Sequence, residues 1–178
     1  MRFHEISKDN MNNGDGLRAV LWVAGCTHYC KGCQNPVTWD PLSGLPFDYD
    51  AEQELWSYLD ADYCSGLTLS GGDPMYQGSR REITKLCQKF RDRYGDSKTI
   101  WMYTGYTYDE VKDEPVMQYI DVLVDGEFEE DKKSAAYMWA GSTNQRIWRK
   151  VDGVFKADPP TFEKSLNEIN CECERGEE

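Results

Sequence analysis

Three cysteines lie close together near the amino end of this 178-residue chain. Cys26, Cys30 and Cys33 bring three thiol groups into one short segment, and no fourth cysteine lies near them in the sequence. A structural zinc site takes four protein ligands. A [4Fe-4S] cluster held by three thiolates keeps one iron open for a further ligand. The spacing therefore indicates a metal centre and favours an iron–sulfur cluster over zinc.

A zinc site completed by His28 or by a distant cysteine is the alternative that the cysteines leave open. Cys64 and Cys87 are poor candidates, because both fall on or beside apolar segments and are expected to be small buried residues. His28 lies inside the cysteine segment, where loop geometry makes it an awkward fourth ligand.

The formal net charge of −12 argues against a nucleic acid or an anionic membrane as a partner, because both require a basic surface. The sequence shows no signal peptide and no apolar run long enough to span a membrane. Seven cysteines, odd in number and clustered, do not suggest paired disulfides. We therefore expect a cytoplasmic, reducing setting, where clustered cysteines bind metals or do chemistry.

Strands and helices are expected to alternate along the chain, which predicts parallel βαβ units and an α/β fold. Gly66 is expected to break the chain just before the third strand. The expected strands are 1–7, 17–24, 67–70, 99–103, 120–124 and 145–150, and the expected helices are 50–63, 79–94 and 107–117.

Capping signals mark the expected helix starts. Asp50 is positioned to cap the first helix. Ser79 with Glu82, and Thr107 with Glu110, fit the capping-box spacing at the second and third helices.

The loops that follow the strands carry the residues suited to chemistry, and parallel strands place such loops at one edge of the sheet. Two glycines, Gly71 and Gly72, allow a ligand to approach the backbone, and Asp73 can accept a hydrogen bond from an ammonium group. An ordinary turn is the alternative for these residues. Asp125 can bind a ribose hydroxyl or begin a turn with Gly126.

The motif Cys26-x3-Cys30-x2-Cys33, followed by Gly71-Gly72-Asp73-Pro74, resembles the radical S-adenosylmethionine superfamily. Within it, the chain is similar to the activating proteins of anaerobic ribonucleoside-triphosphate reductase. Gly32 and Asp73 stand where the superfamily often has an aromatic residue and a glutamate. The closer similarity lies in residues 25–35, 38–39, 69–74, 103–106, 121–126 and 141–146.

The resemblance implies a partial, open (β/α) barrel. Residues 1–160 would form one domain, and the acidic tail 161–178 would be partly disordered. The implied activity is reductive cleavage of S-adenosylmethionine at one [4Fe-4S] cluster. The resulting 5′-deoxyadenosyl radical would generate a glycyl radical on the catalytic subunit of the reductase.

The resemblance also implies roles for single residues. The three cysteines would hold the cluster. Gly71, Gly72 and Asp73 would contact the amino group of S-adenosylmethionine. The backbone from Gly32 through Cys33 to Gln34 would lie against its adenine or ribose. A low-potential electron donor such as flavodoxin would supply the electron.

Two other functions stay open. A small radical S-adenosylmethionine enzyme acting on a small molecule, similar to a deazaguanine synthase, would share the cysteines and the two glycines. A zinc-stabilised binding module would not be an enzyme.

Overall fold

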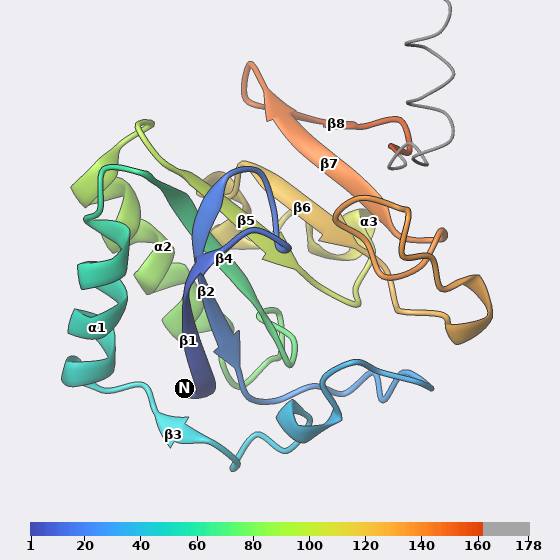
Figure 1. The fold of residues 1–178 in the computed structure, drawn as a ribbon, viewed down its shortest axis with the longest axis horizontal. Coiled ribbons are helices and arrows are strands. Elements are labelled where there is room, and N and C mark those ends of the chain that lie inside the picture. The colour runs from blue at the N-terminus through green and yellow to red at the C-terminus, as the bar shows by residue number, and fades with distance from the viewer. Residues whose placement is uncertain (162–178) are drawn as a thin grey trace, which may run out of the picture.

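The computed structural model describes residues 1–161, which form a mixed eight-stranded sheet with two long helices beside it (Figure 1). The strand order is β3-β1-β2-β4-β5-β6-β7-β8. The strands are β1 (Arg2–Asn10), β2 (Leu17–Val23), β3 (Leu45–Pro46), β4 (Cys64–Gly71), β5 (Thr99–Tyr103), β6 (Val122–Asp125), β7 (Arg146–Val151) and β8 (Val154–Ala157). The helices are α1 (Tyr49–Leu59), α2 (Arg80–Tyr94) and α3 (Tyr108–Val111), with short 3-10 helices η1 (Pro36–Thr38), η2 (Pro115–Gln118) and η3 (Glu130–Lys132).

The four central strands β2, β4, β5 and β6 are parallel, as the alternation of strands and helices predicted. Antiparallel strands extend both edges, β1 and β3 on one side and β7 and β8 on the other. The α/β class is therefore confirmed, as a mixed sheet with few helices. Because the central strands are parallel, the loops after all four leave from the same edge.

One face of the sheet is apolar and packs against the helices. Successive side chains of a strand point to opposite faces, so a row of neighbouring strand positions shares one environment. The main core cluster joins this face to Leu55 and Leu59 of α1 and to Ile83 and Phe90 of α2. Its row across the parallel strands is Leu21, Leu69, Met102 and Leu123.

The opposite face is covered by loops. Trp101 of β5 is buried there and meets Trp139 edge-to-face, with ring centroids 5.9 Å apart. Gly14 packs closely on the same ring, since a Cβ at Gly14 would lie 2.7 Å from Trp101 Cδ2. The Gly14-Asp15-Gly16 segment is thus a turn that closes over this face.

Two capping predictions were wrong. Helix α1 begins at Tyr49, and its cap is the side chain of Asp48, which accepts a hydrogen bond from Ala51 N. Ser79 precedes α2 but makes no side-chain cap bond. Glu82, its expected partner, forms an ion pair with the amino terminus of the chain. The capping box of Thr107 and Glu110 is confirmed.

Two boundaries also differ from the prediction. Gly66 does not break the chain but lies inside β4, where a Cβ would be 1.9 Å from Thr99 O, so glycine permits close strand pairing. The helix predicted over 107–117 ends at Val111, and a 3-10 helix begins at Pro115, which cannot continue an α-helical ladder.

Strands β3 and β8 were not predicted from the sequence. None of the helices in residues 1–161 is both long and apolar enough to cross a bilayer. The tail was predicted over residues 161–178. All of it except residue 161 lies outside the described residues, including Cys171 and Cys173.

Candidate functional site

A cavity of about 580 Å³ opens where the loops of the parallel strands converge. Its lining includes all three clustered cysteines, Cys26, Cys30 and Cys33, together with Gly71 and Gly72. Asp73 and Gln34 also line it, whereas Gly32 and Asp125 do not. The structure thus brings together most of the residues that the sequence analysis selected, although they are spread over β2, β4 and their loops.

The cysteine segment supplies three unpaired thiols. Cys26, Cys30 and Cys33 are half-buried and form no disulfide. Burial raises the pKa of the Cys26 and Cys30 thiols above the ordinary value, so metal binding there would release protons. Within residues 1–161, no three His, Cys, Asp or Glu side chains are arranged to hold one metal ion. In an iron–sulfur cube each thiolate binds a different iron, so the ligands do not converge on a single point.

These thiols fit an iron–sulfur cluster on chemical grounds. Thiolates are the soft ligands that cluster irons prefer. The segment also turns sharply between its cysteines, because Tyr29 and Gly32 adopt positive φ angles of 51° and 72°. A Cβ at Gly32 would lie 2.8 Å from the Glu130 carboxylate, so the small residue lets the cysteine segment lie against the loop after β6.

The two glycines at the end of β4, Gly71 and Gly72, allow backbone segments to approach each other. A Cβ at Gly71 would lie 2.7 Å from Val23 N, and one at Gly72 would lie 2.5 Å from Gly25 O. Gly72 N donates to Val23 O at 2.7 Å, and Asp73 N donates to Gly25 O at 2.8 Å. The turn after β4 is therefore joined directly to the start of the cysteine segment.

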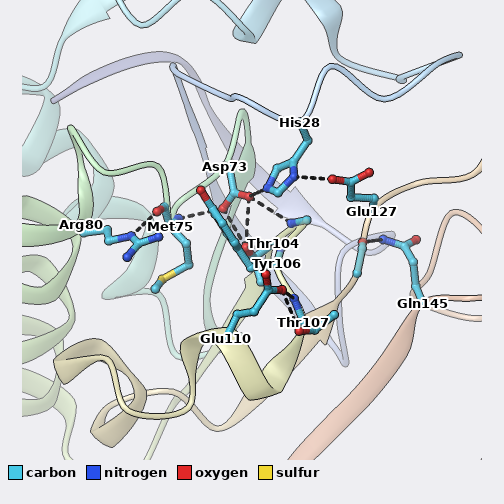
Figure 2. A network of polar contacts seen from close by, with 12 residues as sticks. His28, Asp73, Met75, Arg80, Thr104, Tyr106, Thr107, Glu110, Glu127 and Gln145 are labelled. Atoms are coloured by element: carbon cyan, nitrogen blue, oxygen red, sulfur yellow. Dashed lines mark hydrogen bonds and ion pairs between the residues drawn. The ribbon is translucent and has the colours of Figure 1, made fainter.

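Asp73 is buried, and its carboxylate accepts hydrogen bonds from the protein itself (Figure 2). The backbone N–H of Met75 donates at 2.8 Å and that of Gly105 at 3.0 Å. The hydroxyl of Thr104 lies 2.8 and 3.0 Å from the two carboxylate oxygens. Asp73 thus fixes the turn after β4 against the turn after β5.

His28 links the cysteine segment to this network. Its Nε2 lies 2.9 Å from Asp73 Oδ2, and its Nδ1 lies 2.8 Å from Glu127 Oε1 (Figure 2). The hydrogen bond to Asp73 and the one to Glu127 raise the pKa of His28 to about 9, against the opposing effect of burial. The ring also packs edge-to-face on Tyr106, with centroids 4.6 Å apart. At neutral pH a protonated imidazole therefore bridges two carboxylates beside the cysteines.

Asp125 lies outside the cavity. Its buried carboxylate accepts hydrogen bonds from Arg146 Nε at 3.1 Å and Nη2 at 2.6 Å, and from Tyr108 N at 2.6 Å. These contacts join the end of β6 to β7 and to the start of α3. The structure does not bring Asp125 together with the other candidate residues.

A loop segment that we call the cover (residues 133–141) forms much of the remaining cavity wall. Gln145 holds it in place: its Oε1 accepts from Gly141 N at 2.8 Å, and its Nε2 donates to Gly126 O at 2.9 Å. Aromatic rings of Tyr137 and Trp139 line the wall. The cover thus supplies cavity wall that the strands of the sheet do not.

Sequence reasoning missed several of these residues. His28 was considered only as a zinc ligand, and Glu127 and Gln145 were not selected. Thr104 entered only within residues 103–106, one of the stretches that carry the family similarity. The available signal was position: Thr104 directly follows a predicted strand, and Glu127 comes just after Asp125-Gly126.

The sequence also matches a family model described as a 4Fe-4S single cluster domain, over residues 12–148. That range contains the cysteine segment and every strand from β2 to β6. The match covers most of the chain and places it in an iron–sulfur class of proteins.

Comparison with individual proteins narrows this class. The chain is 40% identical over 158 residues, 89% of its length and 100% of the relative's, to the anaerobic ribonucleoside-triphosphate reductase-activating protein of Enterobacteria phage T4. The proteins of that name from Vibrio cholerae and Escherichia coli K12 are each 39% identical, over 84% and 83% of this chain and 98% and 97% of theirs. The chain belongs to the family of anaerobic ribonucleoside-triphosphate reductase-activating proteins.

Proposed function

We propose that this protein is a radical S-adenosylmethionine activase that generates a glycyl radical on anaerobic ribonucleoside-triphosphate reductase. Cys26, Cys30 and Cys33 would hold one [4Fe-4S] cluster. When bound, the cluster supplies the electron that cleaves S-adenosylmethionine to methionine and the 5′-deoxyadenosyl radical, which takes a hydrogen atom from a glycine of the reductase. The names of the relatives support the choice of partner.

One observation carries the proposal. Three unpaired thiols and the two glycines at the end of β4 line the same cavity, although β3 and α1 lie between them in the sequence. The glycines bring the turn after β4 against the cysteine segment, so a ligand bound at this turn lies beside the thiols. This proximity supports two adjacent binding sites, one for the cluster and one for S-adenosylmethionine.

The chain's own residues have three tasks in this proposal. Gly71, Gly72 and the backbone near Gln34 would bind S-adenosylmethionine. His28 and Asp73 orient the loops that carry the ligands, through hydrogen bonds of 2.9 Å and less. The cover would exclude water from the cavity and so protect a reactive radical from side reactions.

Several finer points belong to the proposal. Four parallel strands with a cavity at their carboxyl edge support a partial, open (β/α) barrel. Residues 1–160 would act as one domain. We also propose a low-potential electron donor such as flavodoxin, and a cytoplasmic location, where reducing conditions preserve thiolate ligands.

The proposal is tested with protein purified and reconstituted without oxygen. Addition of S-adenosylmethionine and a strong reductant should yield methionine and 5′-deoxyadenosine. Addition of the reductase should then give a glycyl radical signal in electron paramagnetic resonance. Cleavage without a glycyl signal would point instead to an enzyme that acts on a small molecule, and a colourless zinc-containing protein would contradict the cluster.

A further inference from the structure

Below the loops that carry the cysteines, three strand residues form a surface that we call the floor: Trp22, Ser70 and Tyr103. Trp22 pairs with Ser70 across β2 and β4. Leu69 pairs with Met102 across β4 and β5, which places Ser70 beside Tyr103. Because side chains alternate along a strand, all three point away from the helices, and all three line the cavity.

The hydroxyl group of Tyr103 is buried and has no hydrogen-bond partner among residues 1–161. A buried hydroxyl that stays unpaired has lost its hydrogen bonds to water without replacing them, which destabilises the folded state. Burial raises the pKa of Tyr103, so the hydroxyl keeps its proton and is available as a donor. The indole N–H of Trp22, in contrast, already donates to Ser7 Oγ at 2.7 Å. Of these two floor side chains, Tyr103 is the one whose donor has no partner within residues 1–161.

The floor carries no charge. The charged side chains that line the cavity are Asp73 and His28, which are paired with each other, and the exposed Lys133 of the cover. A charged ligand on the floor would lose its hydration without gaining a counter-ion. A peptide backbone offers neutral carbonyl and N–H groups, which match neutral hydroxyls.

The contacts proposed for the cofactor lie at the rim of the cavity, by which we mean the cysteine segment and the turn after β4. They are separate from the floor. The three cysteines and Gly72 lie beyond the ends of the strands, whereas the floor residues are still within β2, β4 and β5. A second ligand placed on the floor would therefore lie directly beside a cofactor held at the rim. Such adjacency is what a hydrogen transfer between two bound molecules requires.

We propose that the floor binds the backbone of the glycine-bearing segment of the partner reductase, with the Tyr103 hydroxyl donating to a peptide carbonyl. This inference rests on the proposed function and assigns the substrate side of the same site. Glycine suits the position, because a residue without a Cβ can lay its backbone close to the flat rings of Trp22 and Tyr103. Tyr103 is then a positioning residue for the protein substrate, distinct from the residues that bind S-adenosylmethionine.

The test compares Tyr103→Phe with the wild-type protein, both loaded with the cluster and S-adenosylmethionine, and with the reductase as the probe. The variant should bind the reductase about tenfold more weakly, equivalent to about 1.4 kcal/mol. Its affinity for S-adenosylmethionine should stay within about twofold of wild type, because a single hydroxyl at the floor makes no rim contact. The thermal midpoint should be unchanged or higher, because the change removes an unpaired buried hydroxyl.

Tyr119→Phe makes the same chemical change outside the cavity, at the end of η2, and should bind the reductase normally. An unchanged affinity of Tyr103→Phe for the reductase would overturn the inference. An equal loss of affinity for S-adenosylmethionine would assign the hydroxyl to the cofactor and would overturn it as well. A wild-type protein that fails to cleave S-adenosylmethionine would contradict the proposed function itself.

Discussion

The two ends of the parallel strands both carry buried polar groups, but they use them differently. Near the amino ends, Arg18 is fully buried, and its guanidinium donates to Thr68 Oγ1 at 2.7 Å, to Leu67 O at 2.8 Å and to Thr99 O at 2.8 Å. Further bonds of 3.0 and 3.1 Å reach Thr99 Oγ1 and Asp15 O. Burial lowers the pKa of Arg18 to about 10, so it stays charged at neutral pH.

At the carboxyl ends of the parallel strands, only some of the buried polar groups have hydrogen-bond partners within the described residues. Asp73 accepts hydrogen bonds from four residues of the chain. Among residues 1–161, in contrast, the three clustered thiols form no disulfide and the Tyr103 hydroxyl has no hydrogen-bond partner. Buried groups whose hydrogen bonds are all met within the chain stabilise the scaffold. A buried group that the fold leaves unpaired inside a cavity is a candidate ligand contact. This difference predicts which substitutions damage folding and which damage binding.

The largest effect is expected for Cys30→Ala. Loss of one of the three proposed cluster ligands should reduce S-adenosylmethionine cleavage to below about one per cent of wild type, because the cluster would supply the chemistry. Iron and sulfide per chain should fall in parallel. Cys64→Ala is the matched control: Cys64 is buried at the start of β4, so iron content should persist. Normal cleavage by Cys30→Ala would show that the cluster is held elsewhere.

Arg18→Met should damage folding instead of binding. Removing the guanidinium leaves buried oxygens of Thr68, Leu67 and Thr99 unpaired, which should lower the thermal midpoint by roughly 10 °C. The folded fraction should bind S-adenosylmethionine normally, because Arg18 lies at the opposite end of the strands from the cysteines. Thermal unfolding and equilibrium binding on the same sample separate the two effects. Weaker S-adenosylmethionine binding with an unchanged thermal midpoint would contradict the assignment of Arg18 to folding.

Asp73→Asn and Asp125→Asn compare two buried carboxylates near the carboxyl ends of β4 and β6. Asp73 orients the turns that line the cavity, so Asp73→Asn should weaken S-adenosylmethionine binding about tenfold, with a smaller loss of bound iron. Asp125 pairs with Arg146 outside the cavity, so its variant should lose stability and keep its affinity. Titration calorimetry of both variants is the measurement. A loss of S-adenosylmethionine affinity in Asp125→Asn would instead support the ribose contact that the sequence suggested for Asp125.

The smallest effect is expected for His28→Gln. A glutamine amide can donate to one of the two carboxylates that His28 bridges but not to both, so the thermal midpoint should fall by about 3 °C. The cysteine segment should then retain its iron less firmly during anaerobic gel filtration. Glu127→Gln removes the more exposed carboxylate and should have a weaker effect. A His28→Gln protein that matches wild type in both assays would show that the bridge is dispensable.

The sequence predicted the site edge because strand ends are local features. Short apolar runs placed β2, β4 and β5 well enough to bring the cysteines and the glycines to one edge. The edge strands were missed because β3 has only two residues and ends in proline, and β8 is mostly exposed. Neither has the alternating or apolar pattern from which strands are predicted.

The hydrogen-bond partners of individual side chains could not be predicted, because they depend on contacts between residues far apart in the sequence. His28 lies 99 residues from its partner Glu127, and Asp125 lies 21 residues from Arg146, so neither pairing follows from local pattern. The glycine-glycine turn was expected to accommodate a ligand, and the structure shows that it also accommodates the backbone of Val23 and Gly25. Such close approaches are set by how two loops pack, which no periodicity encodes.

The most direct test of the central claim is the iron and sulfide content of protein prepared without oxygen, measured with S-adenosylmethionine cleavage on the same sample. We predict about four irons and four sulfides per chain. We also predict formation of methionine and 5′-deoxyadenosine once a strong reductant is added. A protein that binds no iron, or that carries the full cluster and leaves S-adenosylmethionine intact under reductant, would contradict the account.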